Sequence, residues 1–322
     1  MDDDRTLLSK LDGALDILLK DRTTRRNIIW ATDDYAHLGD GYEPEAQIQR
    51  RHAWEIKPRS QKEKDTQAGR TRSRAEVFTP LWICNAQINP VDDAVFGRKG
   101  VFNTTDESGR TIYPVSPLET IDFSPITWQK YVDLRRMEIT CGEAPYITSR
   151  YDAATGEYVD ICDRVGILDR KFRAVCENVR DNDAKIKWLL RAIESCYGYE
   201  FQGDSLLLAR LNVMFSYMEV FKQEFGAYPN REHRTAAAWR VSWNFWQMNG
   251  RTYTVPMHAL DKEAIQYDFA GDPYTPSEDP EEPPKRLAEC RIYDHRARRS
   301  FRFTDFSKID DTFSREIENN GR

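Results

Sequence analysis

The sequence predicts an α/β fold built on a mainly parallel, doubly wound sheet. Short apolar segments typical of strands alternate with longer segments whose apolar residues recur at helical spacing, an order that places helices between parallel strands. The clearest strands are expected at residues 136–140 and 198–201, and each carries a carboxylate, Glu138 or Glu200. In sheets of this kind ligands bind beyond the carboxyl ends of the strands, so we expect the functional site at that edge.

Helices are expected before, between and after these two strands. Leucines recur three or four residues apart over residues 2–20, which predicts an amphipathic helix there. Another helix is expected to begin at Pro80, because the fixed φ of proline suits a first turn, and to run to Gln87. Three further helices are expected at residues 170–178, 184–196 and 205–225, the last of them ended by Gly226.

More strands are expected towards the end of the chain. Aromatic and β-branched side chains crowd residues 239–245, a composition that favours a strand. Two apolar segments, Arg291–Tyr293 and Ser300–Phe303, flank a basic turn at His295–Arg299. This arrangement predicts a C-terminal β-hairpin.

Composition divides the chain into an N-terminal helical and basic extension, residues 1–75, and a main domain, residues 76–322. Two insertions are expected in the main domain. Residues 88–130 are rich in Pro, Gly, Asn and Thr and predict an irregular excursion. Residues 271–285 are acidic and rich in proline, which predicts a surface loop or lid.

The charge of the chain is unevenly distributed. The net charge is −6, yet residues 50–74 hold nine Lys or Arg against three Asp or Glu. A basic strip on an acidic protein indicates a surface that contacts phosphates, and an ordinary solvated loop face explains it equally well. For the first interpretation, the residues expected to contact nucleic acid are Arg59, Arg70, Arg72 and Arg74.

The sequence also predicts a cytoplasmic protein. It begins with acidic residues where a secretory signal is basic, and no apolar run reaches the roughly 18–20 residues that span a bilayer. The six cysteines form no CxxC pair, as expected in a reducing compartment. The five histidines are isolated, so neither a zinc site nor a Ser-His-Asp site is indicated and no metal ligand is assigned.

Two segments are expected to meet at the carboxyl edge of the sheet. In Glu138–Ile147 a strand ends in a carboxylate, and Gly142 then allows the backbone to approach a ligand closely. In Gly198–Glu200 a second strand ends in a carboxylate. An acid in that position can accept hydrogen bonds from two ribose hydroxyls, the arrangement used for dinucleotides.

These segments resemble the amino-methyltransferases that modify adenine in DNA. Residues 138–144 are similar to that family's Glu-Pro-Ala-Cys-Gly-x-Gly motif, with Ala144 in place of the second glycine. Residues 198–212 are similar to its next motif, Gly-x-Glu-x-Asp followed by Ala-Arg-x-Asn, with Gln202 in place of the Asp. Residues 77–80 look like the family's Phe-Thr-Pro segment, which closes over the methionine end of the cofactor.

Over roughly residues 27–305 the chain is most similar to bacterial and phage proteins described as restriction-endonuclease modification subunits. The resemblance implies a Rossmann-like fold that binds S-adenosylmethionine and methylates the exocyclic amine of adenine in DNA. It implies DNA as a partner, a specificity or nuclease subunit as a second partner, and no membrane. The residues that it places around the cofactor are Phe78, Thr79, Pro80, Glu138, Thr140, Cys141, Gly142, Pro145, Glu200 and Phe201.

The family's catalytic motif is an Asn or Asp, two prolines and an aromatic residue. Because the adenine amine is a poor nucleophile, the Asn oxygen and a neighbouring carbonyl accept its hydrogens while the aromatic ring stacks on the flipped base. The matching segment here is Asn244-Phe245-Trp246-Gln247. The resemblance assigns Asn244 to the amine and Trp246 to the base face, with Phe245 and Gln247 beside them.

Two alternatives stay open. A methyltransferase-like subunit that binds DNA without catalysis, next to a partner, would also carry an altered catalytic motif. In addition, Asp33-Asp34 followed by Glu55-Ile56-Lys57 imitates the acid and lysine pattern with which nucleases hold Mg²⁺ and activate water. The polar residues 36–54 between them do not predict the strands that such a site needs.

Overall fold

The computed structural model describes residues 3–61, 79–116, 119–260 and 286–305. At its centre lies a three-stranded parallel sheet in the order β3-β4-β5, made of β3 (Arg136–Glu138), β4 (Cys196–Glu200) and β5 (Phe245–Gln247). Glu138 pairs with Gly198, and Glu200 pairs with Gln247. The three strands therefore end at one edge, and the predicted α/β class with a parallel sheet is confirmed.

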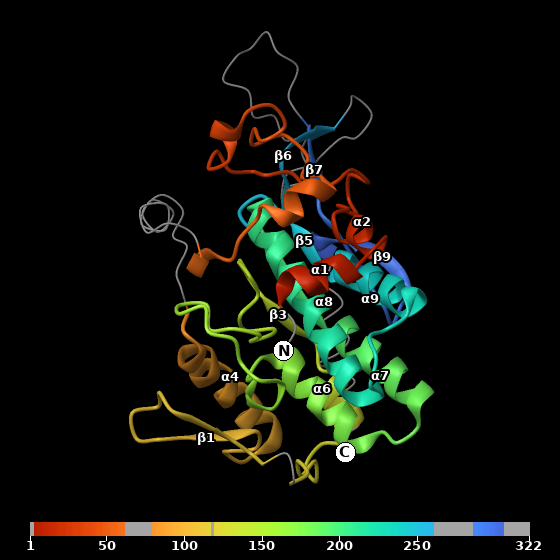
Figure 1. Cartoon of the computed structure of the whole chain (residues 1–322). Coiled ribbons are helices and arrows are strands. Elements are labelled where there is room, and N and C mark those ends of the chain that lie inside the picture. The colour runs from red at the N-terminus through yellow and green to blue at the C-terminus, as the bar shows by residue number, and fades with distance from the viewer. Residues whose placement is uncertain (1–2, 62–78, 117–118, 261–285, 306–322) are drawn as a thin grey trace.

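Helices connect the parallel strands. Two follow β3, α6 (Ile167–Asn178) and α7 (Asn182–Glu194), and two follow β4, α8 (Gly203–Phe225) and α9 (Arg231–Asn244). α8 is buried from Gly203 to Phe221, because it runs through the middle of the molecule with other helices around it (Figure 1). The predicted end of this helix at Gly226, which has a left-handed φ of 74°, is confirmed.

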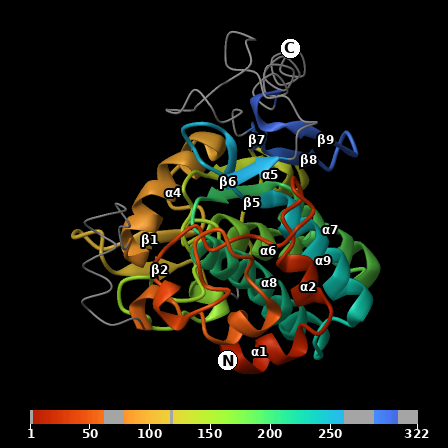
Figure 2. The same cartoon turned by 90° about the horizontal axis from the view of Figure 1, so that it is seen from above.

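The two faces of the sheet are covered differently. Side chains alternate along the strands, so Phe245 faces α8 while Tyr199 and Trp246 face the other way. On that second face they pack against residues of β6 (Thr254–Leu260), β7 (Arg286–Glu289) and β8 (Arg291–Asp294), and β8 pairs with β9 (Arg299–Arg302). In Figure 2 these antiparallel pairs lie on the opposite side of β5 from α8. A doubly wound sheet has helices on both faces, so in the described residues that part of the prediction is wrong.

The N-terminal segment belongs to the same core as the sheet. Leucines of α1 (Asp4–Lys10) and α2 (Ala14–Leu18) pack with the apolar side chains of α8 and α9. Farther along, the Gln247 amide accepts from Ile29 N at 2.9 Å and donates to Ile29 O at 2.8 Å. A Cβ on Gly203 would lie 1.9 Å from Ile29 O, so only glycine allows this close approach.

The remaining α-helices and strands precede β3 in the sequence. α4 (Leu81–Phe96) and α5 (Trp128–Asp133) lie on either side of the hairpin formed by β1 (Asn103–Thr105) and β2 (Ile112–Pro114) in the sequence. Single 3₁₀ turns occur at Ala36–Leu38, Arg50–Trp54, Arg59–Gln61 and Ile161–Asp163.

Several expected elements differ in extent or type. The helix expected over residues 2–20 is broken at Asp12, which has a left-handed φ of 49°. The helix from Pro80 continues past Gln87 to Phe96, so the expected irregular structure over 88–130 is wrong for that stretch and for the β1–β2 hairpin. The hairpin expected near the C-terminus is confirmed as β8–β9. The expected loop 271–285 lies outside the described residues.

The strand expected over residues 239–245 is wrong, because these residues form the end of α9 and the first residue of β5. The Asn230 side chain accepts from His233 N and caps the helix. Ala237, Ala238 and Val241 are buried at helical spacing. Packing of this apolar face therefore outweighs the strand propensity of the neighbouring tryptophans.

Candidate functional site

The two predicted acidic residues lie at the carboxyl edge of the sheet. Glu138 accepts hydrogen bonds from Tyr146 N at 3.4 Å and Ile147 N at 3.2 Å. Glu200 accepts from Gly142 N at 2.9 Å and from Phe201 N at 2.8 Å. Each carboxylate thus accepts hydrogen bonds from the backbone of the loop that follows its own strand. Glu200 also accepts one from the loop after the neighbouring strand β3.

The loop after β3 has an unusual backbone. Thr140, Gly142 and Ala144 have φ values of 47°, 53° and 62°, which lie in the left-handed region that favours glycine. Ala144 adopts this conformation although it carries a Cβ, and it is fully buried. Cys141 N donates to Tyr199 O at 2.8 Å, which fastens the loop to β4. For Thr140 and Ala144, which carry a Cβ, such a conformation costs about 1–3 kcal/mol each, and residues strained in this way collect at ligand sites.

Burial dominates the electrostatics of this edge. It raises the pKa of Glu138 well above the ordinary value, and the nearby charge of Glu200 raises that pKa further, against the hydrogen bonds from Tyr146 and Ile147. Burial also raises the pKa of the Cys141 thiol, so this cysteine is a poor nucleophile. A cationic ligand beside Glu138 would lower this pKa and favour the ionised carboxylate.

A cavity of about 510 Å³ opens between β3 and α4, a volume within the range of small-molecule sites. Its walls include Met137 and Glu138 of β3, Ile88 and Val91 of α4, and Tyr146. Ile139 also lines the cavity and is 66% exposed. The cavity therefore adjoins the predicted acidic edge on the side away from β4.

Polar groups converge on this cavity. The Tyr146 hydroxyl donates to Gln87 Oε1 at 2.6 Å, and the Thr79 side chain also hydrogen-bonds with Tyr146. At the other end, Arg136 Nη2 has no hydrogen-bond partner in the described part of the chain and lies 3.7 Å from Asp92. The cavity thus offers an amide, a phenol and a guanidinium to a ligand.

The structure brings most of the predicted cofactor residues together. Those of the β3 and β4 loops lie at one edge, and Thr79, which precedes Pro80 at the start of α4, hydrogen-bonds with Tyr146 of the loop after β3. Phe78 lies outside the described residues. The sequence did not indicate Gln87, Asp92 or Arg136, because no local pattern shows which face of α4 covers β3. The members at the edge are Glu138, Thr140, Cys141, Gly142, Pro145, Glu200 and Phe201.

The expected catalytic quartet lies elsewhere. Asn244 is the last residue of α9, directly before β5, so it is about 10 Å from the carboxyl edge at roughly 3.3 Å per residue, and β4 separates it from Glu138. It is fully buried, its amide donates to Ile193 O and Cys196 O at 2.9 Å, and its Oδ1 lies 2.8 Å from His295 Nε2. These contacts use the amide in a structural role.

The other three members of the quartet are also in the core. Phe245, Trp246 and Gln247 are at most 2% exposed. Trp246 packs against Tyr199 and Phe303, and Gln247 is engaged with Ile29. In this conformation none of them can contact a flipped base.

The residues expected to contact phosphates are not on a described surface. Arg59 is only 6% exposed, and its backbone N donates to Glu143 Oε1 at 2.7 Å. Arg70, Arg72 and Arg74 lie outside the described residues.

No family model, curated protein or solved structure matches the chain. Among the described residues no helix is both long and apolar enough to cross a membrane. The same part of the chain contains no group of three or more His, Cys, Asp or Glu side chains placed to hold a metal ion. The acids of the nuclease-like pattern, Asp33, Asp34 and Glu55, are therefore not gathered into such a group, and Glu55 instead accepts from the Tyr42 hydroxyl.

Proposed function

We propose that the carboxyl edge of the sheet binds S-adenosylmethionine and that the chain methylates the exocyclic amine of adenine in DNA. The observation that carries this proposal is the pair Glu138 and Glu200, which end neighbouring parallel strands on either side of Gly142. We also propose a cytoplasmic restriction–modification setting, with a specificity or nuclease subunit as partner, on the resemblance described above.

The residues at this edge fit the cofactor. Glu200 accepts from three backbone N–H groups, and it can exchange the one from Gly142 for ribose hydroxyls without leaving its strand. Glu138 suits the cofactor's cationic groups. Burial and the charge of Glu200 oppose its ionisation, and a cation bound beside it would offset both effects. When bound, S-adenosylmethionine supplies an electrophilic methyl group on a positively charged sulfur.

The raised pKa of Glu138 provides a specific test of the cofactor. A cation bound beside this carboxyl should lower its pKa, so cofactor binding should release protons in the pH range where the free carboxyl is still partly protonated. Calorimetry in two buffers of different ionisation enthalpy measures that release. The wild type should release a proton, and Glu138→Gln should bind without releasing one.

Glu200→Gln should weaken cofactor binding about tenfold through loss of a charged acceptor. Glu157→Gln, at an exposed carboxylate, is the matched control and should bind as the wild type does. The cofactor assignment fails if the wild type does not bind, or if Glu200→Gln binds equally well.

A second candidate function is a methyltransferase-like subunit that binds DNA without methylating it. The burial of Asn244 and the use of its amide in three contacts favour this candidate. Transfer of a labelled methyl group to DNA decides between the two. Incorporation supports the enzyme, whereas cofactor and DNA binding without incorporation supports the non-catalytic subunit.

A further inference from the structure

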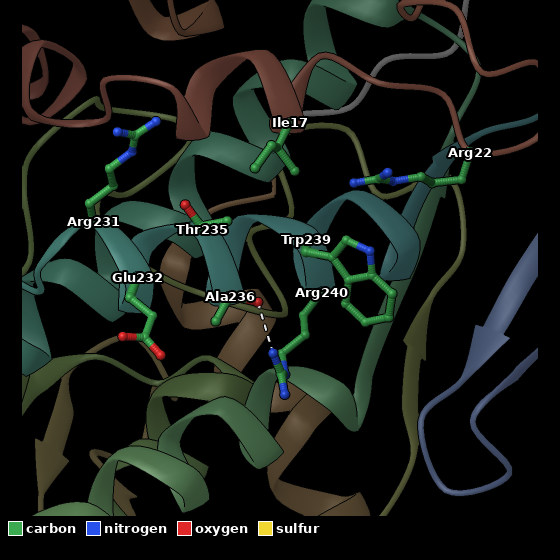
Figure 3. A pocket seen from close by; sticks show the side chains of 8 residues that line it. All are labelled: Ile17, Arg22, Arg231, Glu232, Thr235, Ala236, Trp239 and Arg240. Atoms are coloured by element: carbon green, nitrogen blue, oxygen red, sulfur yellow. Dashed lines mark hydrogen bonds between the residues drawn. The ribbon is translucent and has the colours of Figure 1, made fainter.

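A groove with a volume of about 700 Å³ runs between the α2 segment and α9, away from the carboxyl edge. Figure 3 shows it with Ile17 and Arg22 on one wall and the side chains of α9 on the other. Its floor is apolar, formed by Ile17, Ala236 and the indole of Trp239. Its polar lining comprises three arginines, one glutamate and Thr235.

Two of the arginines have donors to offer. Arg231 is exposed and, within the described residues, makes no hydrogen bond or ion pair. Arg22 directs Nε and Nη2 to Ser242 Oγ at 2.8 and 2.6 Å, and in the described part of the chain Nη1 has no hydrogen-bond partner. The third, Arg240, is neutralised by Glu194 at 2.7 Å. The groove therefore presents two guanidinium groups and one carboxylate, Glu232, to a ligand, which leaves a net positive charge.

Trp239, the aromatic side chain of the groove, is packed against neighbouring rings. Trp239 is half-buried and makes edge contacts with Tyr293, at a centroid distance of 5.0 Å, and with His295, at 5.7 Å. Its side chain lines the groove between Arg22 and Arg240 (Figure 3). A fixed, partly exposed indole beside guanidinium groups is the arrangement on which nucleobases stack.

The spacing suits a polymer. Arg231 and Trp239 are eight residues apart on α9, a rise of about 12 Å, which matches three to four steps of a stacked strand at about 3.4 Å each. The positive surface extends beyond the groove, because the β8–β9 turn carries exposed arginines. Arg291 N donates to Thr23 Oγ1 at 3.0 Å and joins this hairpin to the Arg22 loop. Exposed arginines on the two segments are Arg25, Arg26, Arg298 and Arg299.

We propose that this groove binds a strand of DNA, with an unpaired base on Trp239 and phosphates on Arg22 and Arg231. The choice of DNA rests on the proposed function, while the groove itself is argued from its own charges and ring. A repeating anion with planar bases satisfies both the guanidinium groups and the indole. An acidic peptide satisfies the charges alone.

The test measures the fluorescence anisotropy of a labelled oligothymidine at several salt concentrations. Arg22→Gln/Arg231→Gln should weaken binding at least tenfold and should reduce the salt slope by about 1.4, or 0.7 for each phosphate contact on a single strand. Arg110→Gln/Arg180→Gln, at two exposed arginines far from the groove in the sequence, is the matched control and should leave both quantities unchanged. Arg231→Glu alone repeats the test without disturbing the Arg22–Ser242 contact.

Stacking has its own readout. Oligothymidine should quench tryptophan fluorescence, and Trp239→Phe should remove most of that quenching and weaken binding about tenfold. Trp54→Phe, at a tryptophan that is 45% exposed, should not. The proposal is overturned if the groove variants bind like the wild type, if the control pair loses as much, or if polyglutamate displaces the oligonucleotide as well as unlabelled oligonucleotide does.

The same variants separate this inference from the cofactor proposal. Arg22→Gln/Arg231→Gln should bind S-adenosylmethionine with unchanged affinity. If the cofactor does not bind while the groove variants lose DNA, the groove stands and the cofactor assignment fails. If the cofactor binds and the variants still bind DNA, the cofactor assignment stands and the groove proposal fails.

Discussion

Arg210 joins three parts of the chain, and its replacement by methionine tests how much of the stability depends on that junction. The side chain is fully buried. Nε donates to Phe245 O at 2.8 Å, Nη1 donates to Leu18 O and Lys20 O, and Nη2 donates to Ser242 O at 3.3 Å. Burial lowers its pKa to about 9 and so disfavours the charged guanidinium. The carbonyls and the nearby Asp21 act in the opposite direction and stabilise that charge.

Methionine fills a similar volume but donates no hydrogen bond. It leaves several buried carbonyls without their donor, at about 1–3 kcal/mol each, and removes the charge of Arg210 that favours ionised Asp21. Part of this cost is returned because a buried charge is removed. We therefore expect the free energy of unfolding to fall by about 3–5 kcal/mol, a large share of the total for an ordinary domain. Arg210→Lys keeps the charge but fewer donors, and should lie between.

Urea unfolding followed by circular dichroism measures the effect, and hydrogen exchange of the Ile28–Trp30 amides locates it. Arg231→Met is the control, because that arginine is exposed, and it should change stability by about 0.5 kcal/mol or less. If Arg210→Met lies within about 1 kcal/mol of the wild type, or if those amides stay protected, the junction does not carry this energy.

Two further predictions concern close packing and pH. Gly203→Ala should destabilise the fold by about 1–3 kcal/mol, since its Cβ would overlap Ile29 O. Gly13→Ala, with open space around it, should be neutral or slightly stabilising. Thermal melts compare the two variants, and equal melting temperatures would contradict the reasoning. Burial lowers the pKa of His295 to about 4, so the unfolded chain takes up a proton between about pH 6.5 and 4 while the folded chain does not. Stability should therefore fall by up to about 3 kcal/mol as the pH is lowered through that window, less so in His295→Gln, and an NMR titration that places this pKa near 6.5 would refute it.

Local sequence signals predicted the elements that local interactions decide. The helix ending at Gly226 and the hairpin around the basic turn are defined by a left-handed cap and by apolar alternation, both readable from neighbouring residues. The helix α9 was misread because Trp239, Val241 and Trp243 alternate as in a strand, and only the packing of its alanine face decides the conformation. Tertiary context outweighed propensity there.

The candidate site shows the same division. Glu138 and Glu200 could be predicted because a carboxylate at a strand end is a local pattern, and the parallel register brings the two strand ends together. The α4 side of the cavity could not, since its contact with β3 joins residues about fifty positions apart. Nor could the sequence show that Arg59 is buried or that the Asn244 amide is used within the core.

The contacts of Ile29 also constrain the order in which the chain can fold during synthesis. The side chain of Gln247, which pairs with the backbone of Ile29, lies 218 residues later. Thr23, in the same N-terminal segment, pairs with Arg291, which lies 268 residues later. At about 5–20 residues per second, a ribosome needs about 10–40 s to cover the first of these separations. Once Ile28–Trp30 has left the ribosome, the backbone of Ile29 lacks its Gln247 partner until that residue is made, so a nascent chain halted before Gln247 should depend on chaperones and should aggregate when released.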